Sequence, residues 1–99
     1  MRLNWWPLRC FRVHGDSMSP TLHHGDYVIT RTCLLNLHAG DVVVVQHPQF
    51  DIIIKRIAAI LPHGLTLQGD NLAASTSSER MGLVSHARVL GKVIKCVST

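Results

Sequence analysis

The sequence has few charged and few aromatic residues, and its basic residues form no cluster. Only 16% of its 99 residues are charged and 5% are aromatic, and the ten Lys and Arg residues are scattered along the chain. Proteins that bind nucleic acids use basic patches and, for single strands, aromatic side chains that stack on bases. We therefore expect no nucleic-acid partner and interpret the net charge of +4 as general surface charge.

No hydrophobic run approaches the roughly 20 apolar residues that cross a bilayer as a helix. Residues 1–8 are also too short for the apolar region of a signal peptide. We therefore expect no integral membrane anchor and a cytoplasmic location. The segment Trp5-Trp6-Pro7-Leu8 leaves two interpretations open: packing on the protein, which we favour, or peripheral contact with a membrane.

Metal-binding spacings are also missing. The three cysteines, Cys10, Cys33 and Cys96, include no Cys-x-x-Cys pair, and their number is odd. We expect reduced, mostly buried thiols. Of the seven histidines only His23 and His24 are adjacent, and neighbours on a strand face opposite ways. We therefore predict no metal site and no cofactor.

Helical periodicity is absent, and short runs rich in β-branched residues recur between turn signals. We predict a mainly β fold in a single domain, residues 1–99, because a chain of this length builds one modest core. Residues 72–82 are expected to form a polar loop, and Gly91 a bend or bulge. Strands are predicted at residues 8–13, 27–31, 42–46, 52–60, 65–68 and 87–97.

The sequence does contain a serine on a rigid bend, in Gly15-Asp16-Ser17-Met18-Ser19-Pro20-Thr21-Leu22. Pro20 fixes its own φ and favours an extended residue before it. Gly15 allows a backbone angle that a residue with a Cβ resists. The bend should present the Ser17 hydroxyl, which becomes a good nucleophile only when a base takes its proton.

The candidate base is Lys55, in the predicted strand Asp51-Ile52-Ile53-Ile54-Lys55-Arg56-Ile57. Side chains alternate along a strand, so Lys55 shares a face with Ile53 and Ile57. Burial there would lower the pKa of Lys55, as a lysine base requires. Arg56 faces the other way and is expected to be solvated or paired. The alternative is a lysine at a strand edge whose amine reaches water.

Three blocks, taken in order, resemble the Ser/Lys signal peptidases, peptidase family S26. They are Ser17-Met18-Ser19-Pro20-Thr21-Leu22, then Lys55-Arg56-Ile57, then Gly69-Asp70-Asn71 with Ser75 following. The resemblance covers most of the chain. It implies a coiled, barrel-like, mostly antiparallel β fold of the type shared by signal peptidases and self-cleaving repressors. Within the family, Gly40-Asp41-Val42-Val43-Val44-Val45, His47-Pro48 and Ser75-Thr76 resemble the nickel-type superoxide dismutase maturation proteases.

The resemblance implies a role for each matching residue. Ser17 would be the nucleophile and its backbone N–H the oxyanion donor, Lys55 the base, and Ser75 the group that orients the base. The alternatives are a turn serine at 17 and an ordinary serine at 75. The residues expected to shape the groove and its loops are Gly15, Met18, Pro20, Asp70 and Asn71.

Two positions depart from the family pattern. Gly15 stands where some members have a hydroxyl that assists the oxyanion. Ser77 and Glu79 stand where the family usually has an Asp and an Arg that form an ion pair. That pair is either absent or rebuilt, for which Asp70 and Arg80 are candidates.

We therefore predict a soluble Ser/Lys endopeptidase that removes the N-terminal extension of a protein precursor, in the narrower resemblance a nickel superoxide dismutase. The substrate would bind as an extended segment along a strand edge. The alternatives are leader-peptidase processing of exported proteins and a non-catalytic peptide-binding module. The oligomeric state stays open.

Two other enzyme classes are less favoured. A Ser-His-Asp triad with His14 and Asp16 lacks a Gly-x-Ser-x-Gly elbow. A self-cleaving repressor would need a DNA-binding domain and a cleavable linker, and only sixteen residues precede Ser17.

Overall fold

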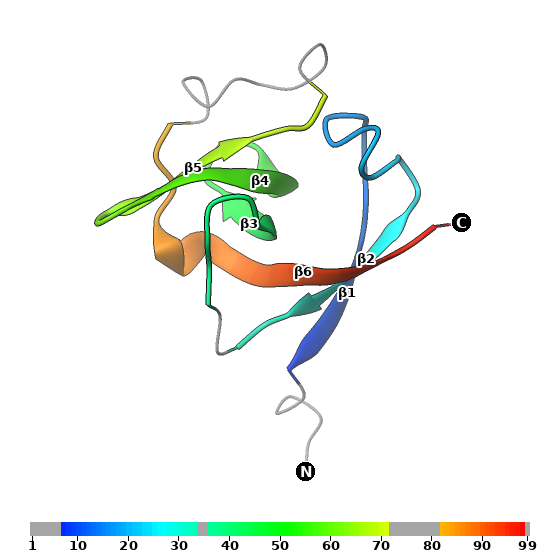
Figure 1. Ribbon diagram of the computed structural model, residues 1–99, viewed down its shortest axis with the longest axis horizontal. Coiled ribbons are helices and arrows are strands. Elements are labelled where there is room, and N and C mark those ends of the chain that lie inside the picture. The colour runs from blue at the N-terminus through cyan, green and yellow to red at the C-terminus, as the bar shows by residue number, and fades with distance from the viewer. Residues whose placement is uncertain (1–6, 34–35, 72–81, 99) are drawn as a thin grey trace.

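The computed structural model describes residues 7–33, 36–71 and 82–98 (Figure 1). Almost all regular structure is β, as predicted, and every strand pairing is antiparallel. No helix in the described ranges is long and apolar enough to cross a membrane. The elements are β1 (Leu8–Arg12), β2 (Tyr27–Arg31), β3 (Val42–His47), β4 (Asp51–Leu61), β5 (Gly64–Gln68), the short 3₁₀ helix η2 (His86–Arg88) and β6 (Val89–Val97).

The six strands form one sheet in the order β1-β2-β6-β3-β4-β5. The last strand, β6, therefore lies between β2 and β3. Figure 1 shows it running across the molecule, with β3, β4 and β5 at one end and β1 and β2 at the other. This long-range pairing joins the N-terminal hairpin to the β3-β4-β5 meander.

Two buried clusters cover opposite faces of β3. Alternation sends Val43 and Val45 into the first cluster and Val44 into the second, and all three are fully buried. An uninterrupted run of apolar residues suits a strand that is covered on both faces. The first cluster is Val43, Val45, Ile57, Leu65, Leu67 and Val84, and the second is Val13, Met18, Leu22, Val28 and Val44.

Strand positions follow the sequence closely, and the largest difference is at the start of β6. The prediction of a strand from residue 87 is wrong there, because residues 86–88 form η2 and the strand begins at Val89. The side chain of Ser85 caps this turn by accepting the N–H of Ala87 at 3.2 Å.

The bulge expected at Gly91 is confirmed. The register between β3 and β6 shifts here, with Val44 opposite Gly91 and Val45 opposite Val89. A Cβ at Gly91 would lie 2.8 Å from both Cβ and Oγ1 of the fully buried Thr30. Glycine therefore allows β6 to approach β2 closely at this point.

The expectation of mostly buried cysteines is wrong. Cys10, Cys33 and Cys96 are all free and exposed. Cys10 lies on β1 opposite Ile29 of β2, on the face of this end of the sheet that neither cluster covers, whereas Cys96 lies opposite the buried Val28, near the exposed end of β6.

Candidate active site

Ser17 lies on a compact turn between β1 and β2. Gly15 has φ of +81°, the left-handed conformation for which glycine was expected. The N–H of Ser19 donates to the carbonyl of Asp16 at 3.1 Å, and the N–H of Leu22 to that of Met18 at 2.9 Å. Since Met18 and Leu22 belong to the second cluster, the core fixes the turn that carries the half-buried Ser17.

Lys55 lies in β4, opposite Val43 of β3, and is only 5% exposed. Ile57 is part of the first cluster and Ile53 packs against it, which confirms that an apolar face surrounds Lys55. Burial lowers the pKa of the Lys55 amine. The alternative of an edge-strand lysine whose amine reaches water is therefore wrong.

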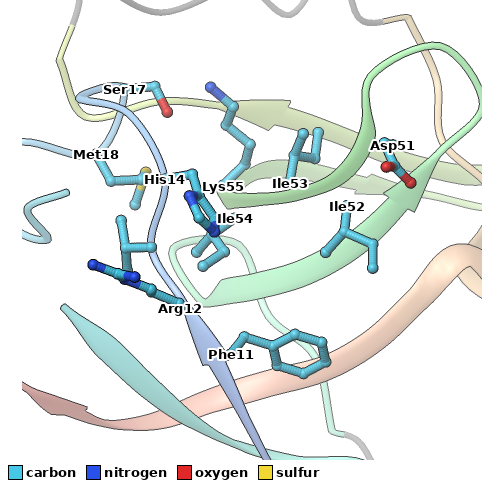
Figure 2. Close-up of a pocket in the computed structure, with 11 residues that line it drawn as sticks. Phe11, Arg12, His14, Ser17, Met18, Asp51, Ile52, Ile53, Ile54 and Lys55 are labelled. Carbon is cyan, nitrogen blue, oxygen red and sulfur yellow. The ribbon is translucent and has the colours of Figure 1, made fainter. Parts of the chain in front are cut away.

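Ser17 and Lys55 line one cavity of about 390 Å³. Figure 2 shows the Ser17 hydroxyl and the Lys55 amine pointing toward one another at one end of the cavity, with Asp51 and Ile52 at the other end. One wall comes from residues 11–14 at the end of β1, and the opposite wall from residues 51–55 at the start of β4. Most of the lining is apolar, which suits a binding site for aliphatic side chains.

Arg56 and Asp70 form a two-pronged ion pair beside this cavity. The guanidinium Nε and Nη2 of Arg56 donate to the two carboxylate oxygens of Asp70 at 2.8 and 2.7 Å. The Thr21 hydroxyl donates to the same carboxylate at 2.6 Å, and Arg56 Nη1 donates to the carbonyl of Gly40 at 2.7 Å. The hydrogen bonds from Arg56 lower the pKa of Asp70, and Asp70 raises the pKa of Arg56. Arg56 is therefore a paired cation, one of the two roles expected for it.

Asn71 connects the third sequence block directly to the turn that carries Ser17. Its backbone N–H donates to the carbonyl of Ser17 at 2.8 Å, and its side-chain amide donates to the carbonyl of Asp16 at 3.1 Å. Sequence reasoning expected Asp70 and Asn71 to shape their own loop. In the structure they hold the turn of Ser17, with Asp70 acting through Thr21 and Asn71 through the backbone.

A histidine contact that the sequence did not reveal also supports the turn. The N–H of Gly15 donates to Nδ1 of His24 at 2.8 Å, and the rings of His14 and His24 meet edge to face with centroids 5.8 Å apart. The two residues of the hydrogen bond are nine positions apart, and no sequence pattern marks such a contact.

The predictions for Ser75, Ser77, Glu79 and Arg80 fall outside the described residues. In the part of the chain that the structure describes, no group of three or more His, Cys, Asp or Glu residues could hold a metal ion.

Comparisons with known proteins place the chain in a peptidase family. The family model described as Peptidase S24-like matches residues 7–94. The mitochondrial ATP-independent inner membrane protease subunit 1a of Arabidopsis thaliana is 32% identical over 110 residues, which include 83% of this chain. The chain spans 66% of that relative's length. The matched region includes both Ser17 and Lys55, and on this match the chain belongs to the Peptidase S24-like family.

Proposed function

We propose that this protein is a Ser/Lys endopeptidase in which Ser17 is the nucleophile and Lys55 the general base. One observation carries the proposal: in a chain of a peptidase family, the Ser17 hydroxyl and a buried Lys55 amine point toward one another at the end of a cavity (Figure 2). Proteases of this kind need a neutral amine beside the serine, and burial favours that neutral form.

The chemistry proceeds in two halves. As Ser17 Oγ attacks the scissile carbonyl carbon, its proton passes to the neutral Lys55 amine. The ammonium then gives that proton to the leaving nitrogen, so the peptide C–N bond breaks and an acyl-enzyme remains. Lys55 next takes a proton from water, whose oxygen attacks the ester carbonyl carbon. Lys55 then returns that proton to Ser17 Oγ as the C–Oγ bond breaks and the acid product leaves. We assign oxyanion stabilisation to the backbone N–H of Ser17 and orientation of the base to Ser75.

The strand pairing indicates how a substrate would bind. Arg56 is the first residue of β4 to pair with β5, so within the described structure residues 51–55 have β3 as their single neighbouring strand. β1 is the edge strand at the opposite end of the sheet and pairs with β2 alone. The cavity thus lies between two strand segments that each have an unpaired edge. An extended peptide could add its backbone hydrogen bonds to either edge.

We propose the N-terminal extension of a protein precursor as the substrate, with small residues near the scissile bond. The narrower candidate is a nickel superoxide dismutase precursor, supported by the resemblance of residues 40–45 and 69–76 to the maturation proteases of that enzyme. A second candidate is leader-peptidase processing of exported precursors, which is favoured by the similarity to a relative that is named as an inner membrane protease subunit. Assignment to the signal peptidase branch and a cytoplasmic location are parts of this proposal.

The test is cleavage of a dismutase precursor that carries its extension, and of an exported precursor, by purified protein. We expect Ser17→Ala and Lys55→Met to abolish cleavage and Ser75→Ala to slow it. Ser19→Ala, on the same turn, and Lys95→Met, on the exposed face of β6, are matched controls that should cleave normally. Melting curves confirm that each variant is folded.

Two results would contradict the proposal. Cleavage by Ser17→Ala at the wild-type rate would exclude Ser17 as the nucleophile. Binding of both precursors by the wild type without any cut would instead support the peptide-binding module.

A further inference from the structure

One carboxylate in the cavity has no partner among the described residues. Three of the described acidic residues are engaged: Asp26 accepts the N–H of His23, Asp41 lies 3.3 Å from the Lys92 amine, and Asp70 binds Arg56. Asp51, in contrast, lines the cavity, and its exposed carboxylate makes no hydrogen bond or ion pair with the described part of the chain. In a protein with a net charge of +4, it is a local negative charge inside a substrate groove.

The position of Asp51 along the groove is set by β4. Figure 2 shows Asp51 at the end of the cavity away from the facing Ser17 and Lys55 side chains. Lys55 lies four positions after Asp51 on β4, a distance of about 13 Å at the usual rise of ~3.3 Å per residue. A substrate strand that pairs with this edge has the same rise. A side chain about four residues from the scissile bond would therefore lie beside Asp51.

The surroundings of Asp51 suit a long basic side chain. Ile52, the next residue of β4, also lines the cavity and is 48% exposed, so it offers apolar surface near the carboxylate. Lysine and arginine pack their aliphatic stems on such surface while the charged end meets an acid. The opposite wall carries Arg12, whose positive charge would disfavour a basic side chain at that part of the groove.

We propose that Asp51 is a specificity residue that selects a lysine or arginine about four residues from the scissile bond of the substrate. The inference rests on the proposed peptidase function. The ion pair between Asp51 and the substrate's lysine or arginine would be partly exposed. The preference for a basic residue should therefore be modest, about two- to fivefold in kcat/KM, and weaker at high salt.

The experiment uses peptides with one cleavable bond in which a single lysine is moved across every position on both sides. For each enzyme the readout is the kcat/KM of the lysine peptide divided by that of the matching alanine peptide. In wild type this ratio should have one maximum, with the lysine about four residues from the bond. When glutamate replaces the lysine, the corresponding ratio should have a minimum at the same position. In Asp51→Asn both should disappear. Asparagine tolerates the left-handed backbone of Asp51, where φ is 64°. Asp41→Asn removes a carboxylate outside the cavity and should keep the wild-type ratios.

The same peptides are also bound to the Ser17→Ala variant, with and without Asp51→Asn, and the Kd ratios are measured by fluorescence anisotropy. A flat lysine scan in an enzyme that cuts, or a maximum that survives Asp51→Asn, overturns the role of Asp51 and leaves the peptidase intact. If no peptide is cut by wild type, the peptidase proposal fails. The binding ratios then still decide whether Asp51 selects a basic residue.

Discussion

Replacing Lys55 with methionine should make the folded protein more stable at neutral pH. Lys55 is 5% exposed, packed in β4 on the face of Ile53 and Ile57, and burial lowers its pKa. A lowered lysine pKa means that the fold disfavours the protonated amine, which the unfolded chain solvates freely. Methionine keeps the apolar stem and removes the ionisable group. The packing difference of such a swap is usually below about 1.5 kcal/mol.

The pH dependence of the gain identifies its cause. Below the folded-state pKa of Lys55 both states are protonated and the full penalty applies. Between that pKa and the unfolded value of about 10.4, the unfolded chain binds one proton more than the folded one. Wild-type stability then rises with pH by at most ~1.4 kcal/mol per unit, and Lys55→Met lacks this rise. The advantage of methionine should therefore shrink through the alkaline range and level off above about pH 10.4. For a domain of this size, each kcal/mol corresponds to roughly 4–8 °C in Tm.

The assay is denaturant unfolding of wild type, Lys55→Met and Lys95→Met at a series of pH values. Lys95 is exposed, so its substitution controls for the loss of one positive charge. Groups that titrate alike in all three proteins cancel in the differences. A stability difference between Lys55→Met and wild type that is constant with pH, or that grows as pH rises, would refute the burial argument.

Two further predictions concern neighbouring parts of the structure. Asp70→Asn loses the charged partner of Arg56, in a pair whose side chains are 28% and 15% exposed, and should cost about 1–3 kcal/mol at neutral pH. Because the pKa of Asp70 is lowered, the stability from this pair is present above about pH 4 and is lost as pH falls through the folded-state pKa. The difference in unfolding free energy between Asp70→Asn and wild type should therefore close in acid. An equal difference at all pH values would contradict this prediction. Gly91→Ala places a methyl group 2.8 Å from Thr30 and should cost about 1–3 kcal/mol in denaturant melts. An unchanged midpoint for Gly91→Ala would show that β6 can move away from β2 freely.

Strand positions could be predicted because they depend on local sequence. The β-branched runs that became β2, β3 and β4 are bounded by turn residues, and their limits differ from the predictions by no more than one residue. Strand order could not be predicted. The insertion of β6 between β2 and β3 depends on packing between residues more than forty positions apart, which no local pattern encodes. The cysteine prediction failed for a similar reason, since exposure depends on which face of the sheet stays uncovered.

The candidate site was predicted in part. The serine bend and the alternation around Lys55 indicated two reactive side chains, and the structure places both in one cavity. The sequence offered Arg80 as a partner for Asp70, whereas the structure pairs Asp70 with Arg56. Arg56 was known only as a cation facing away from Lys55, and the bonds from Asn71 to the turn that carries Ser17 require tertiary contact. Ser75 and the single-domain assignment stay predictions.

Adjacent residues of β4 contribute to both the cavity and the Arg56–Asp70 ion pair, because side chains alternate between the two faces of a strand. Lys55 turns toward the cavity, and Arg56 turns away to meet Asp70. The second contact depends on register: Gln68 of β5 lies opposite Arg56, so Asp70, two residues later, comes within reach. Asp70 and Asn71 then hold the turn that carries Ser17. A one-residue slip of β5 would send its inward side chains outward and remove Asp70 from Arg56. The register of β4 and β5 therefore positions the turn that carries Ser17 beside Lys55, although neither Ser17 nor Lys55 belongs to β5.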